Sequence, residues 1–99
     1  MSALYIVFVE KPADPGEIAE YRRIAQPTLK GRAVKFHTRP GCKLYTVEGD
    51  EVDAVVVLEF DTVEEAKDWY HSPQYQEAVQ HRLGTARSRA VIVEKLPQA

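Results

Sequence analysis

Hydrophobic positions along the chain recur with two periods, one typical of β-strands and one typical of helices. Segments rich in Val, Ile and aromatic residues predict strands at 3–10, 53–60 and 89–95. A weaker pattern runs over residues 32–39, breaks at Pro40-Gly41 and resumes over 43–47. We expect that region to form one long bent strand or two short ones.

The first helix is predicted to begin at Asp14-Pro15, where a carboxylate can cap free amides and proline suits the first helical position. Apolar residues spaced three and four apart form one face: Ile18, Tyr21, Ala25 and Leu29. Pro27 lacks an amide hydrogen, so we expect it to kink or shorten the last turn. Gly31 is expected to end the helix.

A second helical segment follows Asp61-Thr62 and contains the cluster WYHSPQY, residues 69–75. Pro73 would clash with the carbonyl of Trp69 in a straight helix, so a break is expected there. Ser72 then caps a restarted helix. The apolar face of this restarted helix is predicted to contain Tyr75, Ala78, Val79 and Leu83.

The order of these elements is β-α-β-β-α-β, which predicts an α+β fold of the ferredoxin-like type. Its antiparallel sheet would carry both helical segments on one face, in a single domain over residues 1–99. Both faces of the sheet are apolar in the pattern, because Tyr5 and Val7 alternate with Leu4 and Ile6. Helices can cover only one face, so we expect the other to pack on a second copy of the chain.

Composition excludes several classes of function. The net charge is −2 and the basic residues are spread along the chain, which argues against nucleic-acid binding. The apolar run over residues 3–9 is too short to span a membrane. Cys42 is the only cysteine, so an intramolecular disulfide is impossible and a reducing compartment, the cytoplasm, is predicted.

Candidate chemistry is concentrated near the end of the second strand. His37 and Arg39 are two positions apart and should therefore share a face. In a pocket, the guanidinium could hold a carboxylate or enolate while the imidazole moves a proton. Tyr21 and Arg82, beside apolar helical faces, could complete that pocket. The alternative is that His37 and Arg39 occupy a solvated strand end, and Tyr21 and Arg82 a core margin.

The WYHSPQY cluster gives little support for a catalytic centre of its own. Adjacent helical residues point about 100° apart, so His71 beside Ser72 does not indicate a nucleophile with its base. His71 and His81 lack the spacing of metal ligands on one helix face, and we expect no metal.

With these features in place, the chain resembles a bacterial family described as domain of unknown function 1330, in the dimeric α+β barrel (ferredoxin-like) superfamily. The resemblance covers nearly the whole chain and rests on these residues: Asp14-Pro15, Tyr21, Pro27, Glu48-Gly49-Asp50, Val57-Leu58-Glu59-Phe60, Ala66, Trp69-Tyr70, Ser72-Pro73, Tyr75-Gln76 and Arg82. It implies a dimer in which two sheets pack face to face, but no reaction. By analogy, other branches of the superfamily suggest cofactor-independent oxygenation or isomerisation.

The resulting hypothesis is a cytoplasmic homodimer that binds a small anionic or aromatic metabolite between sheet and helices, without a cofactor. Arg39 would anchor the anion and His37 would act as acid or base, with Tyr21, Trp69, Tyr70 and Arg82 lining the cavity. A proton-transfer, oxygenase or isomerase-type reaction fits this hypothesis. The alternative is a non-catalytic dimeric module whose residues serve folding and assembly.

Overall fold

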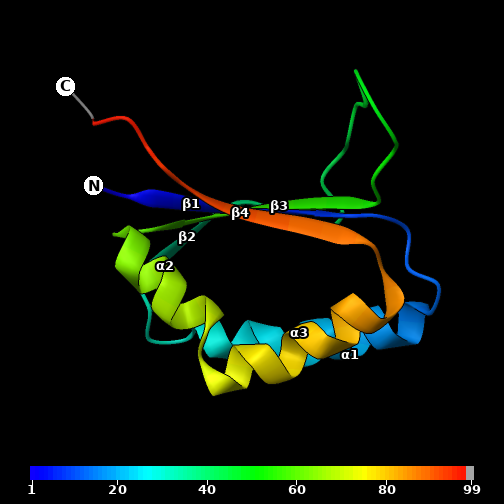
Figure 1. Cartoon of the computed structure of the whole chain (residues 1–99), viewed down its shortest axis with the longest axis horizontal. Helices are drawn as coiled ribbons and strands as arrows, with labels where there is room; N and C mark the ends of the chain where they lie inside the picture. The colour runs from blue at the N-terminus through cyan, green and yellow to red at the C-terminus, as the bar shows by residue number, and fades with distance from the viewer. Residues whose placement is uncertain (98–99) are drawn as a thin grey trace.

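Four antiparallel strands form one sheet in the computed structural model, which describes residues 1–97. The strands are β1 (Ala3–Val9), β2 (Val34–Thr38), β3 (Ala54–Phe60) and β4 (Ser88–Glu94), in the spatial order β2-β3-β1-β4. The helices are α1 (Pro15–Ala25), the short 3₁₀ helix η1 (Gln26–Leu29), α2 (Val63–Tyr70) and α3 (Pro73–Thr85). All of them lie on one side of the sheet (Figure 1). The predicted ferredoxin-like α+β arrangement is confirmed. The last two residues of the predicted 1–99 domain lie outside the described range.

Local signals set the helix ends where the sequence predicts them. The Asp14 carboxylate accepts a hydrogen bond of 2.9 Å from the amide of Gly16, and the Thr62 hydroxyl accepts one of 3.0 Å from the amide of Glu65. Both side chains satisfy amides that have no partner inside the helix. At Pro27 the α-helical pattern of α1 gives way to η1, which shortens the α-helix as predicted.

The WYHSPQY segment is a helix break. α2 ends at Tyr70 and α3 begins at Pro73. Between them, the Ser72 hydroxyl donates to the carbonyl of Trp69 at 2.7 Å and accepts from the amide of Tyr75 at 3.3 Å. The serine is therefore occupied by backbone groups, and its role as a cap is confirmed.

Two local predictions are wrong. Residues 43–47 form no strand, and β2 ends at Thr38. Leu83, predicted on the apolar face of α3, is 58% exposed, whereas Arg82 is 1% exposed. The reason is helical phase: Arg82 follows Tyr75 by about two turns, so it points inward with Tyr75, while Leu83 is rotated away by a further ~100°.

The sheet separates two apolar layers. Tyr5, Val7 and Val9 of β1 are buried beneath the helices. The opposite surface, which we call the helix-free face, carries apolar side chains from three strands: Leu4, Ile6, Phe8, Val55, Val57, Val91 and Val93. Val91 and Val93 are 51% and 47% exposed. The two-sided pattern of the sequence is thus present, with one side covered by helices and the other open in the single chain.

Removing the cap at the helix break should destabilise the fold. We expect Ser72→Ala to lower the free energy of unfolding by about 1 kcal/mol, because an amide of α3 loses its acceptor. Chemical denaturation followed by the fluorescence of Trp69, the only tryptophan, measures this change. Ser72→Asn retains a capping oxygen and should stay close to the parent. Equal unfolding midpoints for all three proteins would contradict the capping role.

Candidate functional site

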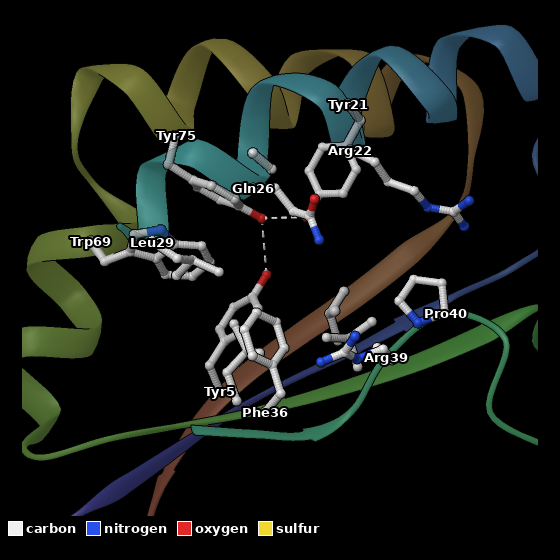
Figure 2. Close-up of a pocket in the computed structure, with 14 residues that line it drawn as sticks. Tyr5, Tyr21, Arg22, Gln26, Leu29, Phe36, Arg39, Pro40, Trp69 and Tyr75 are labelled. Carbon is white, nitrogen blue, oxygen red and sulfur yellow. Dashed lines mark hydrogen bonds between the residues drawn. The ribbon is translucent and has the colours of Figure 1, made fainter. Parts of the chain in front are cut away.

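A pocket of about 200 Å³ lies between the sheet and the helices. Its inner end is formed by buried side chains, among them Tyr5, Trp69 and Tyr75. Its outer end is formed by exposed residues from α1, η1, β2 and the loop that follows β2: Arg22, Gln26, Phe36, Arg39 and Pro40. Figure 2 shows Tyr75 and Tyr21 descending from the helices toward Tyr5 and Phe36, which project from the sheet. The pocket therefore has a buried end and a solvent-exposed mouth.

The size and walls of the pocket suit one aromatic ring. An apolar cavity of about 150 Å³ accommodates benzene, so this one has room for a ring with a small substituent. Apolar side chains make most of the wall: Val7, Ala25, Leu29, Phe36, Val56, Leu58 and Trp69. The indole N–H of Trp69 donates to the Thr28 hydroxyl at 2.9 Å, so its hydrogen-bonding group is already satisfied.

Three phenol hydroxyls meet at the buried end. The Tyr75 hydroxyl lies 2.8 Å from that of Tyr21 and 3.3 Å from that of Tyr5 (Figure 2). We call Tyr5, Tyr21 and Tyr75 the tyrosine triad. Its members come from β1, α1 and α3, and all three line the pocket. Polar groups thus converge at one point of an otherwise apolar cavity, an arrangement typical of ligand sites.

Arg82 lies behind the triad. One of its terminal nitrogens, Nη2, donates to the Tyr75 hydroxyl at 3.5 Å, and the other, Nη1, donates to the Ser88 hydroxyl. The guanidinium also stacks over the Tyr21 ring, 5.3 Å from its centroid. Within residues 1–97, Nε has no hydrogen-bond partner and none of the ion pairs includes this arginine. Arg82 is therefore a buried positive charge balanced by neutral groups only.

The triad hydroxyls keep their protons at neutral pH. Burial raises the pKa of Tyr5 from its ordinary value of 10.0 to about 12, with further contributions from neighbouring tyrosines. Burial likewise raises the pKa of Tyr21 and of Tyr75, and in both cases it outweighs the opposing effect of Arg82. The phenols consequently act as neutral hydrogen-bond donors, and they do not cancel the charge of Arg82.

The mouth adds positive charge on both of its sides. Arg22 approaches from α1, and Arg39 approaches from the residues that follow β2. The guanidinium of Arg39 stacks over the Phe36 ring at 5.2 Å from its centroid, which holds the arginine at the sheet side of the opening. Of the described residues that line the pocket, none is acidic.

His37 does not lie in this pocket, and the prediction that it shares a face with Arg39 is wrong. The register of β2 against β3 shifts between Phe36 and Thr38, and such a bulge breaks the strict alternation of side chains. Phe36 and Arg39 point toward the helices, whereas the His37 imidazole Nε2 lies 2.7 Å from the Glu59 carboxylate on the helix-free face. The sequence pattern could not reveal this, because the bulge depends on pairing with β3.

Glu59 is the acidic centre of the helix-free face. The hydrogen bond with His37 lowers the pKa of the Glu59 carboxyl to about 2, and Lys95 adds contacts of 3.2 and 3.3 Å. The carboxylate is therefore ionised and paired on two sides. The His37 imidazole therefore has its hydrogen-bond partner in this cluster, on the face of the sheet away from the pocket.

The structure places the remaining predicted site residues at different depths. Tyr21 and Trp69 line the pocket. Tyr70 packs behind it, with its ring centroid 5.4 Å from that of Tyr75, and Arg82 contacts the ligand space only through the triad. Sequence reasoning missed Tyr5 and Tyr75, which it assigned to the core. One signal could have found them: a buried phenol requires a hydrogen-bond partner, and Tyr5 and Tyr75 both face the layer between the sheet and the helices.

Residues 1–97 contain neither a cluster arranged to hold a metal ion nor a helix suited to span a membrane. No cluster of three or more His, Cys, Asp or Glu side chains in that range is arranged to hold a metal ion. No helix among the described residues is long and apolar enough to cross a membrane.

Comparisons with known proteins identify relatives of unknown function and a shared fold. The family described as domain of unknown function DUF1330 matches residues 3–96. No curated protein matches the chain significantly.

Solved structures with similar folds include proteins from three different bacteria. RPA0582, a protein of unknown function from Rhodopseudomonas palustris, is 22% identical over 98% of this chain and 84% of its own, with a TM-score of 0.74. A dimeric protein of unknown function with a ferredoxin-like fold from Bacteroides fragilis is 17% identical over 95% and 96%, with a TM-score of 0.53. SnoaB, a cofactor-independent oxygenase from Streptomyces nogalater, is 9% identical over 98% and 93%, with a TM-score of 0.56. At these identities the likeness shows the fold alone.

The buried triad predicts a pH dependence of stability. Because the folded-state pKa of Tyr5 is raised, its contribution is complete below pH 10.0 and is lost as pH rises toward about 12. In that range we expect the native protein to develop less phenolate absorbance than the chain unfolded in guanidinium chloride. Tyr5→Phe should reduce the loss of stability. Superimposable titration curves for native and unfolded protein would refute the burial of these phenols.

Proposed function

We propose that this chain, which belongs to the DUF1330 family, binds a small aromatic anion in the pocket between its sheet and helices. The observation that carries the proposal is the charge of the site. Arg82 is buried beneath the pocket without a carboxylate partner in residues 1–97, and Arg22 and Arg39 flank the mouth. An anionic ligand would balance these charges, since none of the described lining residues is acidic.

The walls restrict the ligand further. An aromatic ring can stack among Phe36, Leu58 and Trp69 at the depth where the cavity is apolar. A carboxylate at the other end of the ligand would lie near the mouth, where Arg39 can bind it with two parallel hydrogen bonds. A volume of about 200 Å³ limits the ligand to roughly one ring with short substituents.

An open cavity favours ligand binding over a purely structural role. A module that serves only folding and assembly would gain stability by filling this space, because voids in a core are destabilising. Neutral phenols beside a buried guanidinium are also suited to stabilise negative charge that develops on a ligand oxygen. Chemistry without a cofactor is consistent with this site, and the similarly folded SnoaB is a cofactor-independent oxygenase.

We further propose that the protein acts as a homodimer through its helix-free face. Burial of this face would remove the half-exposed Val91 and Val93 from water. Glu59 would not be buried alone, because His37 and Lys95 already pair with it. The loop that joins β2 to β3 rises on the same side (Figure 1), and it exposes Tyr45 and Val47 where a partner could cover them. A cytoplasmic location remains a prediction from the single cysteine.

Loss of the mouth arginine should weaken binding of a carboxylate. With benzoate as the probe, we expect saturating ligand to raise the melting temperature of the parent protein, because the ligand binds only the folded state. Arg39→Ala should weaken binding by about tenfold, a value reduced from that of a buried ion pair because Arg39 is exposed. Quenching of Trp69 fluorescence gives the dissociation constants.

Arg32→Ala is the matched control for that experiment, because Arg32 is exposed and lies outside the pocket lining. It should bind benzoate as the parent does. Equal affinities for the parent and both variants would reject Arg39 as an anion anchor. Failure of a series of aromatic acids to bind the parent would reject the proposed function.

A charge on the helix-free face should separate the dimer. We expect Val91→Glu to sediment as a monomer at micromolar concentration, because it would place an unpaired carboxylate in the interface. Leu83→Glu is the control: Leu83 is also exposed and apolar, but it belongs to α3, on the other side of the sheet. It should sediment as a dimer, like the parent. A monomeric parent protein, or a dimeric Val91→Glu variant, would exclude this interface.

A further inference from the structure

We infer that the tyrosine triad and Arg82 form an oxyanion site, which binds the ionised oxygen of a phenol or enol more tightly than the neutral hydroxyl. The inference rests on the proposed function and specifies its substrate class: a small aromatic or conjugated molecule that carries an acidic phenol or enol group. The mouth arginines recognise a carboxylate, whereas the triad recognises the second oxygen at the buried end.

The number of hydroxyl protons shows that the triad has one donor to spare. Tyr75 has one proton and two lone pairs. One lone pair accepts from Arg82, so Tyr75 must accept from one of Tyr5 and Tyr21 and donate to the other. The tyrosine that accepts from Tyr75 keeps its own proton unused within the triad. Both tyrosines that can hold this proton line the pocket, so a ligand oxygen can accept it.

The charge of Arg82 gives that donor its preference for an anion. The guanidinium is 1% exposed and stays protonated at all accessible pH values. Its hydrogen bond to Tyr75 polarises the Tyr75 hydroxyl, which in turn polarises the hydroxyl that accepts from it. Because the raised pKa values keep the three phenols neutral, they transmit positive potential into the pocket instead of cancelling it.

Burial of the network strengthens the attraction of Arg82 and also adds a desolvation cost for any ionised oxygen. Tyr5 and Tyr75 are 2% and 0% exposed, so water is excluded from most of the network. An oxygen that becomes negative beside the network gains a charge-assisted hydrogen bond and the attraction of Arg82 with little screening, and this gain must exceed the desolvation that raises the pKa of the three tyrosines. Tyr75 and Arg82 are positioning residues in this arrangement. Tyr21 and Tyr5 provide the groups that touch the ligand oxygen.

The ionisation of bound 4-nitrophenol tests the inference directly. Its phenolate absorbs visible light and its neutral form does not, so a pH titration of the complex gives the pKa of the bound ligand. We expect the parent protein to lower that pKa by about one unit, which corresponds to about tenfold tighter binding of the phenolate. Quenching of Trp69 fluorescence reports binding independently of ionisation.

Two substitutions identify the triad as the cause. Tyr75→Phe keeps the ring and removes the connection to Arg82, so the bound ligand should regain most of its free pKa. Tyr21→Phe removes a hydroxyl on the pocket side and should reduce the shift as well. Tyr70→Phe is the matched control, because the Tyr70 ring packs against Tyr75 but its hydroxyl does not belong to the hydrogen-bonded triad. It should retain the full shift.

The outcomes separate the two levels of the proposal. Absence of nitrophenol binding to the parent would overturn the inference together with the proposed pocket. Binding without a lowered pKa would overturn the oxyanion site alone and leave the aromatic-anion pocket in place. A full shift in both Tyr75→Phe and Tyr21→Phe would reject the triad as its source. A shift that is lost in those variants and retained in Tyr70→Phe supports the inference.

Discussion

The buried guanidinium of Arg82 is the constraint on which the arrangement of this protein depends. Its charge cannot be removed by deprotonation, so the fold must surround it with groups that tolerate a cation. Those groups come from three elements: Tyr75 within α3, Tyr21 on α1 and Ser88 at the start of β4. The same contacts that satisfy the arginine also fix α1 against α3 and both against the sheet. They are incomplete, because Nε has no partner within residues 1–97.

The phase of α3 is what brings Arg82 inward. Pro73 forces the helix to restart, and Ser72 determines the residue at which it does so. From that origin, Tyr75 and Arg82 share a face, while Leu83 is directed outward. If the helix restarted one residue later, Leu83 would take the buried position of Arg82. The pocket would then lose its polar end. The WYHSPQY cluster therefore serves the site indirectly, through the geometry of the helix that follows it.

Features that are determined by neighbouring residues could be predicted from the sequence, whereas features that depend on contacts between distant segments could not. The caps at Asp14 and Thr62 and the break at Pro73 follow from neighbouring residues, and all were predicted. Residues 43–47 have the composition of a strand but no strand partner in the single chain, so composition alone misled. The placement of His37 depended on a bulge that only pairing with β3 creates.

The candidate site shows the same limit. The sequence pattern indicates Tyr21 and Arg82 as site residues because they lie beside apolar helical faces, and Arg39 because it lies near a strand end. Tyr5 and Tyr75 looked like core residues, since each lies in an apolar periodic pattern. Their role appears only when β1, α1 and α3 are brought together, because a hydroxyl network is a property of three elements and not of any one pattern. The periodicity correctly indicated burial but gave no information about partners.

The bulge in β2 links the two faces of the sheet. It directs His37, on this edge strand, to the ion cluster of the helix-free face, and Arg39, just after the strand, to the mouth of the pocket. In the proposed dimer, His37 would be held by the interface, and this would restrict the backbone that carries Arg39. Association of two copies would then order the anion-binding mouth without contributing a side chain to it. Dimerisation and ligand affinity would then be coupled, because the proposed interface and the proposed mouth both depend on the position of β2.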